Sequence, residues 1–172
     1  MLTLLGLLVV GFAGTGWVRA PVVIHPPKVV YLRDGSTVTV TTSGTVTVRS
    51  RHGQVLSESS CGSATRYWRW ENFMTAFQGA VRRGDRAAVA SKIAYPLRWA
   101  TKTRVTAIGS RAEFLERYTD IFRPTVVKAI LAPDPHALFC QNMTQASIGS
   151  GVIWGDVVGG RPSIITINPP AG

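Results

Sequence analysis

Cysteine, histidine and acidic residues are scarce in this sequence of 172 residues, which has two cysteines, three histidines and nine aspartates and glutamates. The histidines are far apart, and their spacing does not fit a zinc site. The sequence contains no phosphate-binding glycine loop, nucleophile elbow or paired-cysteine motif. The common signatures of nucleotide-binding proteins, serine hydrolases and zinc proteins are therefore missing, and we expect no metal and no cofactor.

Basic residues outnumber acidic ones by 19 to nine, which gives a formal charge of +10 at pH 7. Most of the excess lies after residue 60. A positive charge of this size favours anionic partners such as a membrane surface, a cell-wall polymer or a nucleic acid. A solvated surface rich in arginine is the simpler explanation, since net charge by itself determines only solubility and loose binding.

Residues 1–20 are apolar up to Val18, and the sequence Val18-Arg19-Ala20 is typical of a signal-peptidase site. We therefore predict a secretory signal peptide, although no Lys or Arg precedes the apolar run. A retained membrane anchor formed by residues 1–18 is the alternative. The predicted location is the periplasm or the exterior, or else the inner membrane facing the periplasm. Export argues against nucleic acid as a partner.

Residues 21–60 are predicted to form a β-rich N-terminal extension. Threonine and valine alternate over residues 37–42 and 45–48, and the pairs Asp34-Gly35 and Ser43-Gly44 are turn signals. The pattern predicts a meander of three or four strands. Such a sheet has one thin apolar face, so we expect it to dock on the remaining chain or on a partner.

Three amphipathic helices are predicted in residues 61–172. The first has apolar residues at helical spacing, the second is short and follows Gly84-Asp85, and the third follows a capping box formed by Ser110 and Glu113. The apolar stripes are Trp70, Phe73, Met74, Phe77, Ala80 and Val81 in the first helix, and Phe114, Leu115, Tyr118, Ile121 and Phe122 in the third.

Strands are predicted around these helices. One or two strands lie in residues 95–108, and three more lie at residues 137–143, 150–158 and 163–168, with loops at residues 145–149 and 159–160. Pro124 is expected to end or kink the third helix. Residues 126–131 are compatible with either a helix or a strand. The order of elements predicts the α+β class.

Four segments carry a resemblance to a known family. They are FMTAFQGAVRRGDRAAVASKIAYPL, IGSRAEFLERYTDIF, SGVIWGDV and SIITIN. In sequence and in order, these segments resemble secreted bacterial members of the cone-shaped superfamily of nuclear transport factor two and ketosteroid isomerase. The resemblance implies that residues 61–172 form a curved antiparallel sheet wrapped around three helices. Members of this superfamily include isomerases and dehydratases, and many others bind ligands or form homodimers.

Cys61 and Cys140 allow a single intramolecular disulfide, which an oxidising compartment would favour. The alternative is two unpaired cysteines in the core. Isomerase chemistry would need a buried carboxylate, and Asp156 is a weak candidate because it shares a predicted strand face with Trp154. Asp120 is predicted to lie on the outer side of its helix.

Two further groups of residues are candidates for binding. Five aromatic residues could line the mouth of a cone or form its core: Tyr95, Trp99, Tyr118, Phe122 and Trp154. Five arginines could contact an anionic partner or remain solvated: Arg66, Arg69, Arg82, Arg83 and Arg86.

These features leave three functional hypotheses. The first is an exported, non-catalytic binding or protein-interaction module of the bacterial envelope, whose partner is an envelope protein or an anionic envelope component. The second is a small-molecule isomerase or dehydratase that uses a carboxylate in the cone. The third is a structural subunit of an envelope assembly. A carboxylate deep in the cone beside a tyrosine would favour the second hypothesis.

Overall fold

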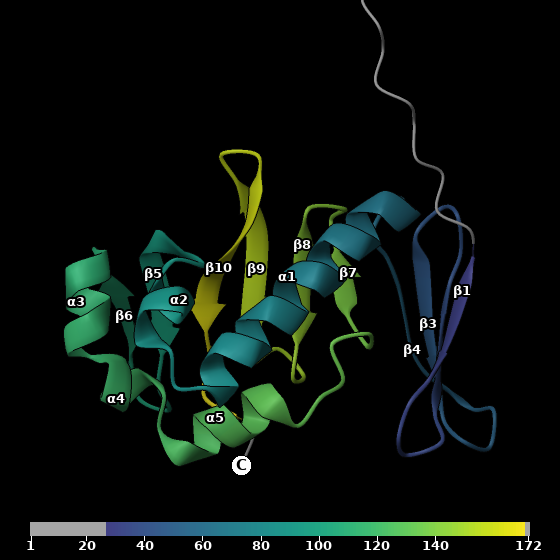
Figure 1. Cartoon of the computed structure of the whole chain (residues 1–172), viewed down its shortest axis with the longest axis horizontal. Helices are drawn as coiled ribbons and strands as arrows, with labels where there is room; N and C mark the ends of the chain where they lie inside the picture. Colours follow the sequence, from purple (N-terminus) through teal and green to yellow (C-terminus); the bar gives the residue numbers. More distant parts are fainter. Residues whose placement is uncertain (1–26, 171–172) are drawn as a thin grey trace, which may run out of the picture.

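The computed structural model describes residues 27–170, so the predicted signal peptide or anchor lies outside the described residues. Two sheets and five helices make up this part of the chain, and the α+β class is confirmed (Figure 1). None of its helices is long and apolar enough to cross a membrane.

The first sheet is the predicted Thr/Val meander, with four antiparallel strands in the order β1-β2-β3-β4. The strands are β1 (Lys28–Tyr31), β2 (Thr37–Val40), β3 (Thr45–Arg49) and β4 (Val55–Ser60). Its buried face consists of Val38, Val40, Val46 and Val48, while the alternating threonines face outward. These valines belong to the same apolar core as α1, so the sheet docks on the remaining chain.

The end of this sheet approaches the first helix closely. Cys61 donates its backbone N–H to the carbonyl of Gly44 at 2.9 Å. A Cβ at position 44 would lie 2.5 Å from the backbone of Ser63, and φ of Gly44 is +82°. Only glycine fits both constraints, because it has no Cβ and tolerates positive φ.

Helix α1 (Ala64–Arg82) begins earlier than the apolar stripe predicts, because Ser63 caps it by accepting from the backbone N–H of Arg66 at 3.2 Å. Its stripe is buried apart from Phe73, which is half-buried. Helix α2 (Arg86–Ala90) is capped by Asp85 as predicted, but it ends earlier than expected. The reason is that Ile93 already belongs to β5, where it is paired with Ile164.

The second sheet has six strands in the order β6-β5-β10-β9-β8-β7. They are β5 (Ile93–Ala100), β6 (Val105–Ile108), β7 (Phe139–Gln141), β8 (Gln145–Ile148), β9 (Ile153–Val158) and β10 (Arg161–Ile167). The expectation of a purely antiparallel sheet is wrong in one place, since β10 and β5 are parallel. The last strand enters the centre of the sheet, after a crossover through helices that permits parallel pairing.

Several boundaries in this sheet differ from the prediction: β5 begins at residue 93 rather than 95, β7 covers only residues 139–141 of the predicted 137–143, and β10 covers residues 161–167 rather than 163–168. Residues 145–148, expected as a loop, form β8, and the turn comes earlier, at Asn142 and Met143. Residues 150–152 precede β9 rather than belonging to it. Positive φ at Gly149, Ser150 and Gly151 explains the later start, because a strand cannot continue through this conformation.

The predicted third helix is divided into α3 (Arg111–Glu116) and α4 (Tyr118–Ile121), and it is followed by α5 (Pro124–Leu131). The serine half of the capping box is confirmed: the Ser110 hydroxyl accepts from the N–H of Glu113 at 3.2 Å. The Glu113 carboxylate accepts from the N–H of Gly109 at 2.8 Å instead of from Ser110. Pro124 starts α5, where its missing N–H costs no hydrogen bond. The ambiguous segment 126–131 is therefore helical, and the described chain has five helices rather than the expected three.

The helices lie in front of the six-stranded sheet in Figure 1, and the main core lies between these two layers. The aromatic ridge of the third helix is buried there, as predicted. The Cys61–Cys140 disulfide is also confirmed, with its Cα atoms 5.1 Å apart. It joins the end of the meander to β7, beside a hydrogen bond from the N–H of Cys140 to the Ser59 hydroxyl.

Candidate functional site

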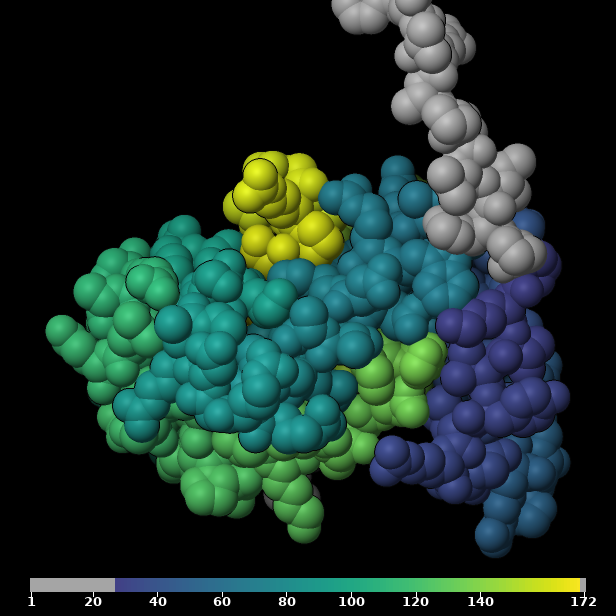
Figure 2. Space-filling model, in the orientation of Figure 1, coloured from purple at the N-terminus to yellow at the C-terminus, as the bar shows by residue number. Residues whose placement is uncertain are grey.

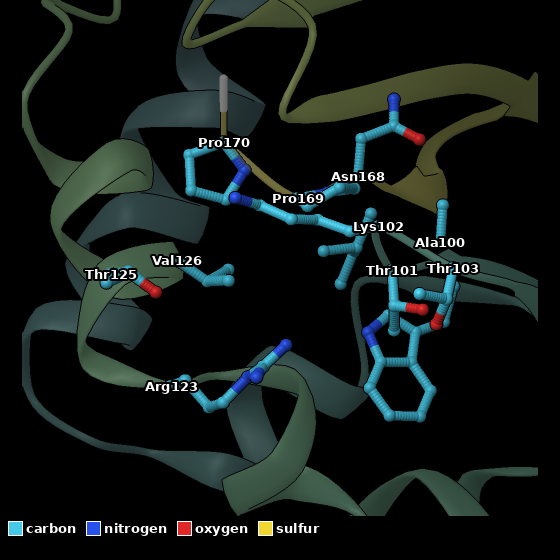
Figure 3. Close-up of a pocket in the computed structure, with 12 residues that line it drawn as sticks. Ala100, Thr101, Lys102, Thr103, Arg123, Thr125, Val126, Asn168, Pro169 and Pro170 are labelled. Carbon is cyan, nitrogen blue, oxygen red and sulfur yellow. The ribbon is translucent and has the colours of Figure 1, made fainter. Parts of the chain in front are cut away.

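A pocket of about 450 Å³ lies where β5 and β10 end and α5 begins. Figure 3 shows Arg123 and Thr125 on one side of this pocket, and Thr101, Lys102 and Asn168 on the other. Its lining is Trp99, Ala100, Thr101, Lys102, Thr103, Arg123, Thr125, Val126, Ile167, Asn168, Pro169 and Pro170.

The floor of the pocket is apolar. Three buried side chains form it: Trp99 from β5, Ile167 from β10 and Val126 from α5. Alternation along β5 places Leu97 and Trp99 on the face covered by helices, whereas the exposed Arg98 lies on the other face. The indole of Trp99 therefore lies at the edge of the core between the sheet and the helices, and the pocket begins at this edge.

The rim of the pocket is positively charged. Lys102 and Arg123 are exposed and belong to separate loops, and neither Asp nor Glu is among the described residues that line the pocket. The hydroxyls of Thr101, Thr103 and Thr125 add neutral hydrogen-bonding groups. An apolar floor with a cationic rim matches a ligand that has an apolar body and an anionic group.

A smaller hollow of about 240 Å³ adjoins this pocket and is lined by Trp99, Thr101, Asp120 and Arg123. Asp120 is exposed on α4, as its position on the outer side of the predicted helix indicated. Among the described residues that line these two hollows, Asp120 is the only one with a carboxylate.

Of the five aromatic pocket candidates, only Trp99 lines the main pocket. Tyr95, Tyr118 and Phe122 pack around Phe114 instead, with ring centroids 5.8 to 6.2 Å from it. Tyr118 and Phe122 are stacked at 4.6 Å. This cluster fills the space between helices and sheet with side chains, so these three residues form core.

Trp154 and Asp156 lie on the opposite face of the sheet from the helices, which corrects the expectation that they point inward. Their neighbour Gly155 faces the helices, since a Cβ there would lie 2.6 Å from the Trp70 ring. Side chains alternate along a strand, so Trp154 and Asp156 face the other way. Asp156 accepts a hydrogen bond from the amide of Gln145 at 3.0 Å on that face.

The five candidate arginines do not form one cluster. Arg66 and Arg69 share a shallow hollow beside the β9–β10 hairpin. Arg86 lies over the ring of Tyr118, 5.1 Å from its centroid. Arg82 and Arg83 are exposed at the other end of α1.

A partly buried polar cluster was not predicted from the sequence. Nδ1 of His136 is 2.6 Å from Oδ1 of Asp134, and its Nε2 is 2.9 Å from Oε1 of Glu71. The hydroxyl of Tyr67 donates to the carbonyl of His136 at 3.0 Å. Burial raises the pKa of Tyr67, and the nearby Glu71 and Asp134 raise it further. Tyr67 and Glu71 are one helical turn apart in the sequence, and this spacing was the feature that could have indicated the cluster.

The described residues contain no group of three or more His, Cys, Asp or Glu side chains placed to hold a metal ion. No protein-family model, curated protein or solved structure matches this chain.

Proposed function

We propose that this protein is an exported binding domain of the bacterial envelope that takes up a small amphipathic anion in the pocket above Trp99. The observation that carries the proposal is the pairing of a buried apolar floor with the Lys102 and Arg123 rim, in a lining without carboxylates. The anionic group of the ligand would lie between the two cations. Its apolar part would cover the indole.

Two features support the exported location. The disulfide joins cysteines separated by 79 positions, and such bonds persist in oxidising compartments. The sequence of residues 1–20 has the apolar run and small-residue site of a signal peptide. The two features are independent, because one is a structural contact and the other is a sequence pattern.

Binding fits the pocket better than isomerase chemistry does. Such chemistry needs a carboxylate base beside hydrogen-bond donors within the cavity. Asp156 faces away from the helices, and Asp120 lies in the exposed hollow next to the main pocket. The buried Glu71 lies beside Tyr67, but its Oε1 contacts Nε2 of His136 at 2.9 Å, and neither Glu71 nor Tyr67 lines the pocket.

We further infer that residues 61–172 adopt the cone fold of the superfamily that the sequence resembles. The order of the helices and the six-stranded sheet with helices on one face support this. In a cone fold the mouth lies where the sheet and helices diverge, and on this proposal the pocket above Trp99 is that mouth. Fold likeness does not determine the ligand, so the pocket chemistry defines the proposal.

Titration with 8-anilinonaphthalene-1-sulfonate tests the pocket, because this dye combines an aromatic body with a sulfonate and fluoresces in apolar surroundings. The double variant Lys102→Glu/Arg123→Glu should bind it about tenfold more weakly, or worse, because two attractive charges become repulsive. Trp99→Leu should lower the fluorescence of the bound dye.

Two variants that each reverse a single charge, Arg33→Glu and Lys102→Glu, provide a matched comparison. Arg33 is exposed in the first turn of the meander and does not line the pocket. Each variant changes the net charge equally, so a general charge effect would weaken both alike. Equal losses, or undiminished binding by the double variant, would exclude the pocket as the anion site.

A further inference from the structure

The end of the sheet opposite the pocket carries a second surface of distinct chemistry. Strand β10 runs from this end, at Arg161, to the pocket, at Ile167. The β9–β10 turn, the β7–β8 turn and the first turns of α1 lie together at this end (Figure 1). Figure 2 shows the yellow hairpin next to the start of α1 on the molecular surface. We call this surface the hairpin face.

The hairpin face is rich in cations. Arg66, Arg69 and Arg161 are exposed, and Nη2 of Arg69 donates to the carbonyl of Gly160 at 2.8 Å. Lys28, the first residue of β1, extends its Nζ to 4.2 Å from the ring centroid of Trp68 on α1. The nearest acidic residue on the hairpin is Asp156, which accepts from Gln145 on the outer face of the sheet.

Apolar side chains project between these cations. Met143, Val157 and Val158 are 56%, 38% and 47% exposed. Met143 and Val157 line a shallow hollow of about 250 Å³ together with Arg66 and Arg69, and neither Asp nor Glu is among the described residues lining it. Exposed apolar groups interspersed with arginines are typical of surfaces that insert into the headgroup region of a bilayer.

The backbone of the β7–β8 turn holds Met143 in place. Asn142 and Met143 have φ values of +51° and +58°, a conformation that is unfavourable for a side chain such as methionine. Met143 rests against Gly62, where a Cβ would lie 3.1 Å from its Cγ. The turn therefore presents an apolar side chain beside the cations at a conformational cost, which is common at binding surfaces.

The described chain also begins at this face. Lys28 contacts α1 there, and 26 residues precede Pro27 in the sequence, with an apolar run that extends to Val18. If that run is retained as an anchor, its connection reaches the described chain at β1, which contacts α1 through Lys28 and Trp68.

We propose that the hairpin face docks on an anionic phospholipid bilayer. Lys and Arg side chains near such a surface are attracted to its negative charge, and salt weakens this attraction. Arg66, Arg69 and Arg161 would contact the headgroups, and Met143 and Val157 would enter the interfacial region. In this orientation the pocket above Trp99 opens away from the bilayer, at the far end of β10.

The test compares the full chain on vesicles of phosphatidylcholine alone and on vesicles with 30% phosphatidylglycerol. Sedimentation with the vesicles at low salt and in 0.5 M NaCl gives the affinities. The expected result is at least tenfold tighter binding to the anionic vesicles at low salt. The triple variant Arg66→Glu/Arg69→Glu/Arg161→Glu should lose this preference.

A control variant, Arg33→Glu/Arg51→Glu/Arg104→Glu, changes the net charge equally at exposed arginines outside the hairpin face. It should keep the lipid preference. Amide hydrogen exchange separates docking by this face from insertion of the apolar N-terminal run. Residues 142–144 and 158–161 should become protected on anionic vesicles, and residues 101–104 should not. Equal binding to both lipids, equal losses in both variants, or no protection of the two turns would overturn the proposal.

Discussion

Nε2 of His136 lies 2.9 Å from Oε1 of Glu71, and this contact joins the loop before β7 to the middle of α1. The Glu71 side chain is 10% exposed, and its Oε2 is buried without a hydrogen-bond partner among the described residues. Nδ1 of His136 meets Asp134 at the same time. The imidazole of His136 therefore lies between two carboxylates, with one at each ring nitrogen.

We predict that Glu71 and His136 are energetically coupled. His136→Ala should lower the free energy of unfolding by about 2–4 kcal/mol, since it leaves the buried Glu71 carboxylate unpaired. Glu71→Ala should lower it by less, because His136 keeps its contact with Asp134. The double variant should lose less than the sum, with a coupling energy of about 1–3 kcal/mol. Urea unfolding of the parent protein, the two single variants and the double variant gives the free energies for this double-mutant cycle.

The exposed pair Glu113 and Arg117 is a matched control, with a 3.4 Å contact one helical turn apart. Its coupling energy should be about 0.5 kcal/mol or less, because solvent screens it. Additive losses in the Glu71–His136 cycle would show that the two side chains contribute independently.

Helical periodicity was enough to predict most of the helical layer. The stripe from Trp70 to Val81 and the ridge from Phe114 to Phe122 are buried as the spacing indicates, apart from Phe73 and Leu115, which are half-buried. The cap residues Ser110 and Asp85 also start helices as predicted. These features depend on residues close in sequence, so local patterns identify them.

The sheet was harder to predict because its pattern is ambiguous. Alternation shows that Trp154 and Asp156 share a face, but it does not show which face the helices cover. The inward position is Gly155, whose lack of a side chain makes room for Trp70 and gives no hydrophobic signal. Strand β8 was missed for a similar reason, since it alternates small and polar residues.

The pocket depended on contacts distant in sequence. Lys102 and Arg123 line the same pocket because the loop after β5 and the start of α5 both lie next to the end of β10, and local patterns did not predict this arrangement. Trp99 was identified from its place on a strand face. The cations at the rim were not identified, because exposed Lys and Arg residues are common in loops of a basic chain.

The approach of Trp70 to Gly155 gives a second prediction. Gly155→Ala would place a Cβ 2.6 Å from a ring atom of a buried indole in the core. We expect the free energy of unfolding to fall by about 2 kcal/mol or more, since overpacking displaces buried side chains. Thermal unfolding followed by circular dichroism measures the change.

Gly109→Ala is the control for this substitution. A Cβ there would have no neighbour closer than the carboxylate of Glu113, at 3.7 Å. Its effect should stay within about 0.5 kcal/mol, as for most surface substitutions. Adding Trp70→Phe to Gly155→Ala should recover part of the loss by removing the clashing ring. A Gly155→Ala protein as stable as the control would contradict the packing described here.

The disulfide gives a third prediction. It closes a loop with a sequence separation of 79 and attaches the meander to β7. Cys61→Ala/Cys140→Ala should lower the free energy of unfolding by about 4 kcal/mol as an upper value in the chain-entropy model. The loss should be measured by urea unfolding without reductant. Addition of reductant should then destabilise the parent protein and leave the double variant unchanged. A parent protein with two free thiols after export would refute the bond.

The buried phenol of Tyr67 gives a pH prediction. Burial holds its pKa above the ordinary value of about 10, so the folded protein keeps the phenolic proton where the unfolded chain loses it. The contribution of this group is fully present below pH 10. It should decrease above pH 10 by at most about 1.4 kcal/mol per pH unit, because unfolding then releases a proton.

Tyr67→Phe isolates this effect. Burial also raises the pKa values of Tyr95 and Tyr118, so the parent protein alone cannot assign the slope to one residue. The variant should be less stable at pH 8, because it loses the 3.0 Å hydrogen bond to the carbonyl of His136. Its stability should nevertheless fall less steeply between pH 10 and 11, and the two curves should converge. Urea unfolding at half-unit pH steps measures both curves, and parallel curves over that interval would show that Tyr67 ionises as readily in the folded protein as in the unfolded chain.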